Sequence, residues 1–251
     1  MHHVDRLLRQ DRNRVILLSV ALCLLRAGTA LATAGLLIAD DPFARDRERM
    51  VRDQIEYRGI RNSDVLRVLR ATPRHLFVPA NARFMAYEDR PLPIGNGATI
   101  SQPYIVALMT ELLQPAKKDR LLEIGTGSGY QAAVLAQLVS WVYTIEIVPE
   151  LAKSAGENLN RLGYSNITVR QGDGYRGWTG EGPFDRIILT AAPPEIPQVL
   201  VNQLASGGRL IAPIGSAWNQ ELVLLEKTAE GKIRRSSKGT VAFVPMHGGE
   251  K

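Results

Sequence analysis

The chain has 251 residues, 45% of them hydrophobic and 6% aromatic, and its 31 Lys and Arg against 25 Asp and Glu give a formal net charge of +6. This composition is typical of a globular chain of one or two domains and excludes collagen, coiled coils and wholesale disorder. The single cysteine, Cys23, excludes a disulfide within the chain and a cysteine-based zinc site, and the four histidines lack ligand spacing, so no metal is expected. The mild positive charge is no nucleic-acid signature, and no nucleic-acid partner is expected.

The first 40 residues resemble an export or anchoring segment. Arginines precede an apolar run over 15–25, Arg26 interrupts it, and small and apolar residues with cleavage-like Ala-x-Ala patterns continue to residue 39. This layout is typical of a secretory signal peptide. If Arg26 is tolerated, residues 15–39 could instead cross a membrane. A third reading is an extension outside the working protein, with Met50 as the true start.

These three readings stay open. In each of them, residues 1–40 form an amino-terminal extension, and residues 41–251 form the working domain with its core over 50–251.

The predicted elements begin with helices over 45–57, ended by Gly59, and from Ser63 to a stop at Pro73. Residues 71–100 are rich in Pro, Gly and Asn and are expected to be irregular, and a helix is expected over 104–113.

From residue 121 onward short apolar strands alternate with helices. Strands are expected over 121–124, 141–147, 167–170, 184–190 and 209–214, the last after a turn at Gly207-Gly208, and helices over 131–138, 149–162 and 196–204. This alternation predicts an α/β fold with a parallel sheet covered on both faces. Two last strands, over 221–227 and 240–245, have no helix between them and predict an antiparallel edge.

Three glycines follow the first of these strands and precede a helix: Gly125, Gly127 and Gly129. In such a sheet a ligand binds at the carboxyl ends of the strands, above the amino terminus of the helix. The turn lacks the Lys-Ser/Thr of a P-loop, and Tyr130 stands where the dinucleotide fingerprint has its third glycine. A nicotinamide oxidoreductase is therefore disfavoured.

Acidic residues end the next two strands at the same edge of the sheet. Glu146 can accept hydrogen bonds from both ribose hydroxyls, and Asp173, between two glycines, can accept from an adenine amino group. Taken alone, Glu146 is more often a solvated strand end and Asp173 a turn residue. The glycine turn and both acids in this order predict the adenosyl site of a class I S-adenosylmethionine-dependent methyltransferase, a Rossmann-like fold.

From about Met50 onward, the chain resembles the protein-L-isoaspartate O-methyltransferase family. The first 49 residues have no counterpart in that family's usual pattern. The stretch after the fourth strand has neither the amide nor the aromatic ring that is typical of amino-group methyltransferases. The resemblance rests on the blocks Leu92–Gly95, Thr99–Tyr104, Leu121–Gln131, Gly172–Gly174, Thr190–Pro197 and Phe243–Met246.

The resemblance implies methyl transfer from S-adenosylmethionine to the α-carboxylate of L-isoaspartyl residues, and of D-aspartyl residues, in damaged proteins and peptides. It implies that Ser101 is the catalytic residue, although a serine before Gln-Pro is by itself more often a helix cap. It implies substrate contacts at Thr99, Ser101, Val241 and Val244. Cofactor contacts are expected at Glu123, Gly125, Gly127, Ser128, Gly129, Glu146, Asp173 and Gly174.

Two alternatives stay open beside this interpretation. One is a methyltransferase for another carboxylate or a small molecule, and the other is a catalytically silent adenosyl-binding module tethered by residues 15–39. The resemblance favours a cytoplasmic monomer, whereas the amino-terminal segment favours export to the periplasm or anchoring in the inner membrane. Membrane contact is expected only if residues 15–39 are retained.

Overall fold

The structure is a computed structural model that describes residues 41–216 and 218–249. The chain divides into two units, residues 1–44 and residues 45–251. The predicted signal or anchor segment lies outside the described residues. None of the described helices has both the length and the apolar character that crossing a membrane requires.

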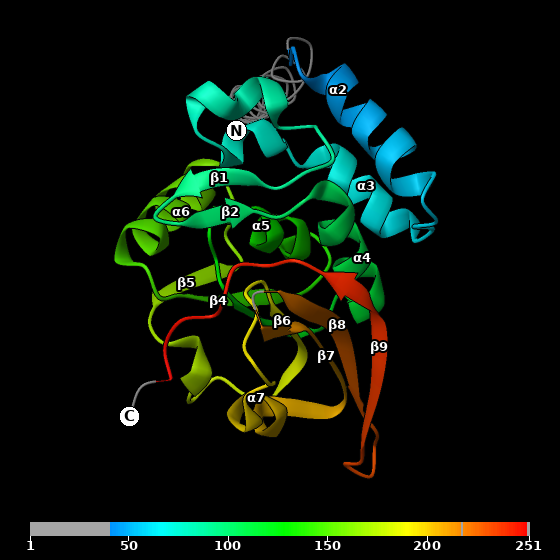
Figure 1. Cartoon of the computed structure of the whole chain (residues 1–251), viewed down its shortest axis with the longest axis vertical. Coiled ribbons are helices and arrows are strands. Elements are labelled where there is room, and N and C mark those ends of the chain that lie inside the picture. Colours follow the sequence, from blue (N-terminus) through cyan, green and yellow to red (C-terminus); the bar gives the residue numbers. More distant parts are fainter. Residues whose placement is uncertain (1–40, 217, 250–251) are drawn as a thin grey trace, which may run out of the picture. The chain divides into compact units, whose positions relative to one another are not determined.

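Seven strands form one sheet in the order β5-β4-β3-β6-β7-β8-β9 (Figure 1). The strands from β5 to β7 pair in parallel, and β8 and β9 add antiparallel pairs at one edge. The predicted α/β fold with an antiparallel carboxyl-terminal edge is confirmed. The strands are β3 (Arg120–Ile124), β4 (Trp141–Glu146), β5 (Ile167–Gln171), β6 (Phe184–Leu189), β7 (Leu204–Ser216), β8 (Asn219–Lys227) and β9 (Ile233–Val241).

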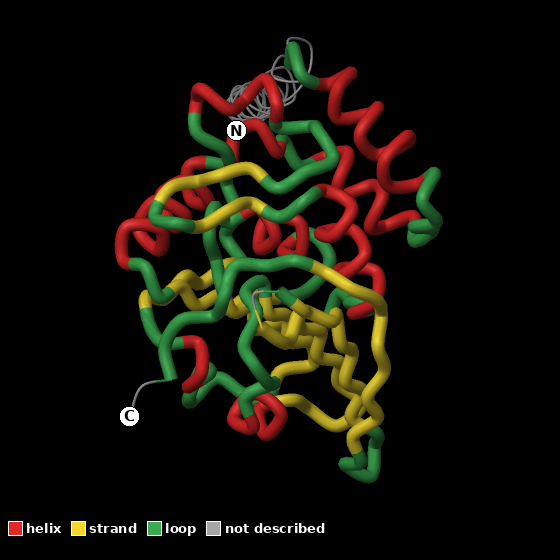
Figure 2. The backbone as a smooth tube through the Cα atoms, in the orientation of Figure 1, coloured by secondary structure: helices red, strands yellow, loops and turns green. Residues whose placement is uncertain are grey.

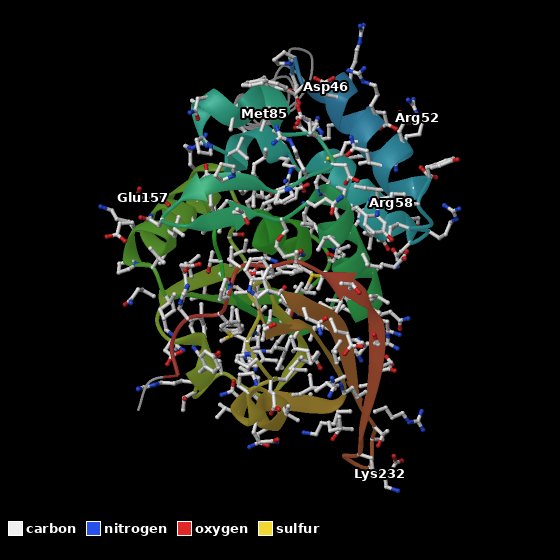
Figure 3. The ribbon with its side chains drawn as sticks, viewed as in Figure 1. Asp46, Arg52, Arg58, Met85, Glu157 and Lys232 are labelled. Atoms are coloured by element: carbon white, nitrogen blue, oxygen red, sulfur yellow. The ribbon has the colours of Figure 1, made fainter. Side chains whose placement is uncertain are left out.

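Helices cover both faces of the sheet, with α4, α5 and α6 above it and α7 below it in Figure 1. They are α4 (Pro103–Leu113), α5 (Tyr130–Ala136), α6 (Pro149–Arg161) and α7 (Gln198–Gln203). In α6, Leu151, Ala155 and Leu159 recur at helical spacing and are buried. Glu157, on the same helix, projects into solvent (Figure 3). The core is therefore the apolar layer between the sheet and these helices.

The amino-terminal part of the second unit is helical, as predicted. The expected helix over 45–57 is α2 (Ala44–Arg49), which continues with wider turns as η1 (Met50–Glu56) and ends before Gly59 at a φ of 102°. Asn62 caps α3 (Ser63–Ala71), because its side-chain oxygen accepts the Asp64 and Val65 N–H groups.

The expectation that residues 71–100 are irregular is wrong for much of this segment. It contains the short helices η2 (Arg74–Phe77) and η3 (Ala80–Met85) and an antiparallel hairpin of β1 (Leu92–Gly95) and β2 (Ala98–Ile100). The hairpin turns at Asn96 and Gly97, whose φ values of 51° and 73° are both positive. Asn-Gly is the preferred dipeptide for such a two-residue turn, so this signal was present in the sequence.

The predicted last strand over 240–245 is also wrong in its position. β9 ends at Val241, because its partner is β8 and the ladder runs from Ile233↔Lys227 to Val241↔Gln220. Most β9 side chains are exposed, so an apolar pattern could not mark the strand. The expected turn at Gly207-Gly208 lies inside β7, where the register with β6 shifts.

Residues 242–247 leave the sheet and are called the strap here. In Figure 2 the strap is part of the loop that follows β9. The Ala192 N–H donates to the Val244 carbonyl and the Met246 N–H donates to the Ala192 carbonyl, each at 2.9 Å. The strap is thereby fastened beside the segment that follows β6.

Gln220, which is 3% exposed, fastens the beginning of the strap. Its Oε1 accepts the Phe243 N–H at 2.6 Å and its Nε2 donates to the Phe243 carbonyl at 2.9 Å. We expect Gln220→Ala to lower the free energy of unfolding by about 1–3 kcal/mol, because it strands these backbone groups. Urea denaturation measures the change. Gln220→Glu, which restores only the acceptor, should lie between the two, and an unchanged stability of the alanine variant would contradict this role.

Candidate active site

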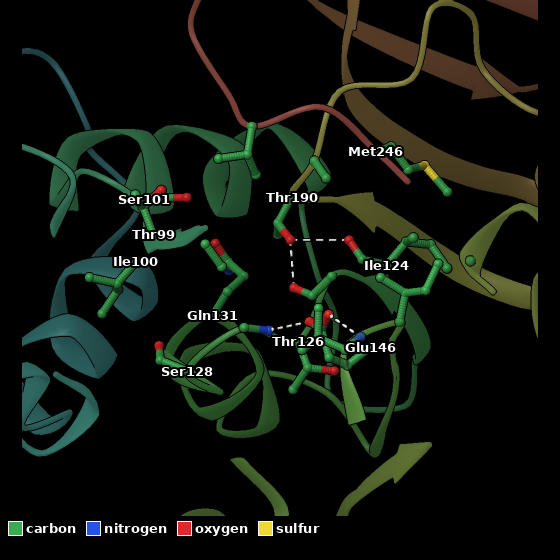
Figure 4. A pocket seen from close by; sticks show the side chains of 18 of the residues that line it. Thr99, Ile100, Ser101, Ile124, Thr126, Ser128, Gln131, Glu146, Thr190 and Met246 are labelled. Atoms are coloured by element: carbon green, nitrogen blue, oxygen red, sulfur yellow. Dashed lines mark hydrogen bonds between the residues drawn. The ribbon is translucent and has the colours of Figure 1, made fainter. Parts of the chain in front are cut away.

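A cavity lies at the carboxyl ends of β3, β4 and β6 (Figure 4). Its wall is formed by the β1–β2 turn, the start of α4, the strap and residues 125–129, which are called the glycine loop here. Its volume of about 980 Å³, part of it open to solvent, is at the upper end of the range for ligand pockets. The cavity is large enough for a nucleoside-sized ligand together with part of a second substrate.

The glycine loop leaves β3 and is closed against two neighbouring strands. The Gly125 N–H donates to the Ile145 carbonyl at 2.8 Å, and the Thr190 hydroxyl donates to the Gly125 carbonyl at 2.5 Å. Gly125 has a φ of 97°, and a Cβ there would collide with the Thr190 Oγ1. Glycine is therefore required at 125 for both backbone conformation and space.

Glu146 lies at the end of β4, is 6% exposed and lines the cavity, as predicted. Its Oε2 accepts the Gly127 N–H at 2.8 Å and its Oε1 accepts the Val148 N–H at 3.1 Å. Each carboxylate oxygen can accept more than one hydrogen bond, so both can still accept hydroxyl groups of a ligand. Glu146 thus braces the glycine loop and presents an acceptor to the cavity.

Glu123 is fully buried beneath the glycine loop and does not line the cavity. Its Oε2 accepts the Thr144 hydroxyl at 2.6 Å, and Thr144 in turn accepts the Thr126 hydroxyl at 2.7 Å. Burial raises the pKa of Glu123 to about 8, and the nearby charge of Glu146 acts in the same direction. Glu123 is therefore neutral at pH 7 and supports the loop from below.

Asp173 does not line the cavity, although its neighbour Gly174 does. One carboxylate oxygen accepts the Tyr175 N–H at 2.9 Å and the other accepts the Gly249 N–H at 3.0 Å. The carboxylate predicted to meet an adenine amino group thus holds the residues after the strap in place.

The expected substrate residues Thr99 and Ser101 both line the cavity, opposite the glycine loop. The cap of α4 is Gln102, without a side-chain cap, and Pro103 is the first helical residue. The Ser101 hydroxyl makes no hydrogen bond to any residue that the structure describes. The capping alternative for Ser101 is therefore wrong, and its hydroxyl is available at the cavity wall.

Val244 lines the cavity, whereas Val241 pairs with Gln220 at the end of β9 and does not. Most backbone groups of the strap are engaged within the chain, because Phe243 binds Gln220, and Val244 and Met246 bind Ala192. The strap therefore offers a side-chain wall rather than a free strand edge.

Of the remaining predicted residues, Gly127 and Ser128 line the cavity, and Gly129 caps α5 outside its wall. Sequence reasoning missed Gln131, which is 8% exposed, lines the cavity and donates from Nε2 to the Thr110 hydroxyl at 3.0 Å. His247, interpreted as a surface residue, also lies at the rim. Only the three-dimensional arrangement brings these polar groups to the wall.

Across residues 41–216 and 218–249, no group of three or more His, Cys, Asp or Glu is arranged to hold a metal ion.

The parallel sheet and the glycine loop at its carboxyl edge define a class I S-adenosylmethionine-dependent methyltransferase. The family model of protein-L-isoaspartate(D-aspartate) O-methyltransferase matches residues 45–251. The chain belongs to this family.

Known relatives agree with this assignment. The chain is 55% identical over 208 residues to the protein-L-isoaspartate O-methyltransferase of Methanoculleus marisnigri, which covers 83% of this chain and 94% of the relative. Protein-L-isoaspartate O-methyltransferase 2 of Syntrophobacter fumaroxidans is 49% identical and covers 94% of this chain and 95% of the relative. That match leaves about 15 residues of this chain unmatched, so it reaches into residues 1–40.

Two solved structures share the fold. A protein-L-isoaspartate O-methyltransferase superposes with a TM-score of 0.72 at 30% identity, over 80% of this chain and 66% of that longer chain. A Plasmodium falciparum protein assigned to the same enzymes, in complex with S-adenosyl-L-homocysteine, gives a TM-score of 0.68 at 27% identity, over 80% of this chain and 98% of that chain.

The bracing role of Glu146 predicts a loss of cofactor affinity on substitution. In Glu146→Gln the amide nitrogen must face one of the two N–H donors, so one charge-assisted hydrogen bond is lost. We expect affinity for S-adenosylhomocysteine to fall about tenfold to a hundredfold, because such bonds contribute about 1.5–3 kcal/mol. Calorimetric titration measures it, with the exposed Glu157→Gln as the matched control. Equal affinities of the two variants would contradict the role.

The buried Glu123 predicts a pH-dependent stability. Its pKa is about 8 in the folded chain against 4.5 for the free group, so between these values the folded chain keeps a proton that the unfolded chain loses. Stability from this group is full below pH 4.5, falls as the pH rises and levels off above about 8. Glu123→Gln should flatten this slope in urea denaturation across the window. Parallel slopes for variant and wild type would contradict the assignment.

Proposed function

We propose that the cavity is the site of the family's reaction and that Ser101 is its catalytic residue. The chain methylates the α-carboxylate of L-isoaspartyl residues, and of D-aspartyl residues, in damaged proteins and peptides, with S-adenosylmethionine as the methyl donor. The observation that carries the proposal is the Ser101 hydroxyl, which stands on the wall of the cavity that the glycine loop also lines.

The residues present fit the cofactor. The glycine loop offers backbone groups without side chains to a ligand, and a Cβ at Gly125 would disturb its packing on Thr190. We infer direct cofactor contacts from Gly125, Gly127, Ser128, Glu146 and Gly174. When bound, S-adenosylmethionine supplies an electrophilic methyl group on its sulfonium.

Glu123, Gly129 and Asp173 act indirectly in this proposal. Glu123 supports the loop through Thr144 and Thr126, Gly129 begins α5, and Asp173 fastens the chain after the strap. An indirect role matches their positions, because none of the three lines the cavity.

The proposed chemistry needs orientation rather than a general base. A carboxylic acid with a pKa near 4 is already ionised at pH 7, so its oxygen is nucleophilic without proton transfer. The Ser101 hydroxyl donates to one carboxylate oxygen and thereby directs the other toward the methyl group. Thr99, on the preceding strand, offers a second hydroxyl to the same carboxylate. Holding the reacting atoms in line is a large part of catalysis for such a transfer.

The peptide is proposed to lie along the strap. Val244 contacts it at the cavity, and Val241 contacts it farther out, at the end of β9. Apolar contacts of this kind select little among side chains, which suits substrates that share only a damaged linkage.

We also propose the organisation of the chain and its location. Residues 41–251, with a core over 50–251, form the methyltransferase domain, which is supported by the family match over 45–251. Residues 1–40 form an extension, and the match of the Syntrophobacter relative into this segment supports it as part of the protein. The proposed state is a cytoplasmic monomer, because the methyl donor is made in the cytosol.

Substituting Ser101 tests the catalytic proposal. We expect Ser101→Ala to lower kcat/KM for an isoaspartyl peptide about tenfold to a hundredfold, the loss of one hydrogen bond to a charged group. Affinity for S-adenosylhomocysteine should stay unchanged, and Ser101→Thr should recover part of the rate. Base-labile methyl label on the isoaspartyl peptide, with its normal aspartyl twin as the control, measures the rate. Equal labelling of both peptides would instead support a general carboxylate methyltransferase.

A further inference from the structure

The turn that roofs the cavity carries a chemically labile dipeptide. Asn96-Gly97 joins β1 and β2, lines the cavity rim and is the single Asn-Gly in the chain. Asn-Gly is the dipeptide that deamidates most readily, because glycine has no side chain to obstruct attack by its own nitrogen. We propose that Asn96 is a site of spontaneous deamidation, and that the isoaspartyl residue formed there impairs the site and makes the chain a substrate for a second copy.

The reaction is balanced with water as the single co-reactant. The Gly97 nitrogen attacks the Asn96 Cγ, a new N–C bond forms, and the Cγ–Nδ2 bond breaks with release of ammonia. Water then opens the five-membered ring at the former main-chain carbonyl. Gly97 is left attached through Cγ, and the α-carboxylate of residue 96 is free, which is an L-isoaspartyl linkage.

Nothing among the described residues protects this turn. Asn96 and Gly97 are exposed, neither the Asn96 side chain nor the Gly97 N–H is hydrogen bonded to a described residue, and no atom lies within 4 Å of a Cβ built on Gly97. The backbone rotation that brings the Gly97 nitrogen to Cγ meets no side chain. Reactivity close to that of a flexible peptide is therefore expected.

The chain contains an internal comparison. Asp173-Gly174, its single Asp-Gly, has the second dipeptide type that cyclises readily, and Gly174 also lines the cavity. Here the carboxylate is held by the Tyr175 and Gly249 N–H groups, and a Cβ on the buried Gly174 would collide with Ile124. Cyclisation must break these contacts, so Asp173 is expected to persist where Asn96 reacts.

Damage at position 96 reaches both sides of the cavity. An isoaspartyl linkage lengthens the main chain and adds a carboxylate between Gly95 and Ala98, which are paired across the turn. The Ile94 Cδ1 lies 3.4 Å from a Cβ built on Gly127, so β1 is packed against the glycine loop. On the other strand, Thr99 is paired with Pro93. A shift of the turn therefore displaces cofactor and substrate residues together.

Ageing the full-length chain tests the proposal. The chain is incubated at physiological temperature and mildly alkaline pH, and peptide mapping by mass spectrometry then follows positions 96 and 173. The peptide over residues 92–101 is aged in parallel. We expect isoaspartate at 96, an intact Asp173, and methyl-transfer activity lost in proportion to the converted fraction. Asn96→Gly, which accepts a positive φ and cannot deamidate, should keep its own initial activity over the same period.

Two results would overturn the damage site. One is an intact Asn96 under conditions that convert the peptide. The other is equal relative loss of activity in wild type and Asn96→Gly.

The second part rests on the proposed function and has its own measurement. Aged Ser101→Ala chain, which cannot label itself efficiently, is offered to fresh wild-type enzyme with labelled S-adenosylmethionine. Label above that of the aged Ser101→Ala, Asn96→Gly double variant is expected. An isoaspartyl peptide in the same series separates the two failures. A labelled peptide with an unlabelled aged chain overturns this inference, whereas no label on either overturns the proposed function.

Discussion

The carboxylate of Glu146 holds the glycine loop in shape, and the rest of the cavity depends on that loop. Its two oxygens accept N–H groups from Gly127 in the loop and Val148 before α6. The end of β4 thereby fixes the position of a segment that belongs to β3. Thr190, after β6, closes the other side through the Gly125 carbonyl. Three parallel strand ends thus share one backbone turn, which is why a ligand site forms at this edge.

The second acid explains how so much polarity is stable under the loop. Glu123 is fully buried, and burial raises its pKa to about 8. A neutral carboxyl group avoids a second negative charge beside Glu146, and it still accepts the Thr144 hydroxyl. The two acids therefore differ in their tasks because their environments differ. Glu146 faces the cavity with hydrogen-bond partners for both oxygens, whereas Glu123 has a single printed polar neighbour in the core.

The parts of the fold that follow from local pattern were predictable. Apolar strands that alternate with helices imply a covered parallel sheet, and glycines between strand and helix imply a loop at its carboxyl edge. The parts set by pairing were not. The position of β9 depends on its ladder with β8, and its side chains are mostly exposed. The same limit applies to the site. A sequence places Asp173 at a strand end, but it cannot show that Gly249, far along the chain, occupies its carboxylate.

The hairpin over the cavity shows that one geometric requirement can have two consequences. A two-residue turn with positive φ at both positions strongly favours asparagine followed by glycine. That preference builds a tight roof that brings Thr99 and Ile94 to opposite parts of the wall, and it also places a labile dipeptide at the rim. Asp173-Gly174 meets the same chemical hazard by burial and hydrogen bonds, which an exposed turn at the rim cannot use. The accessibility that a rim position gives the turn is therefore also what leaves Asn96 open to cyclisation.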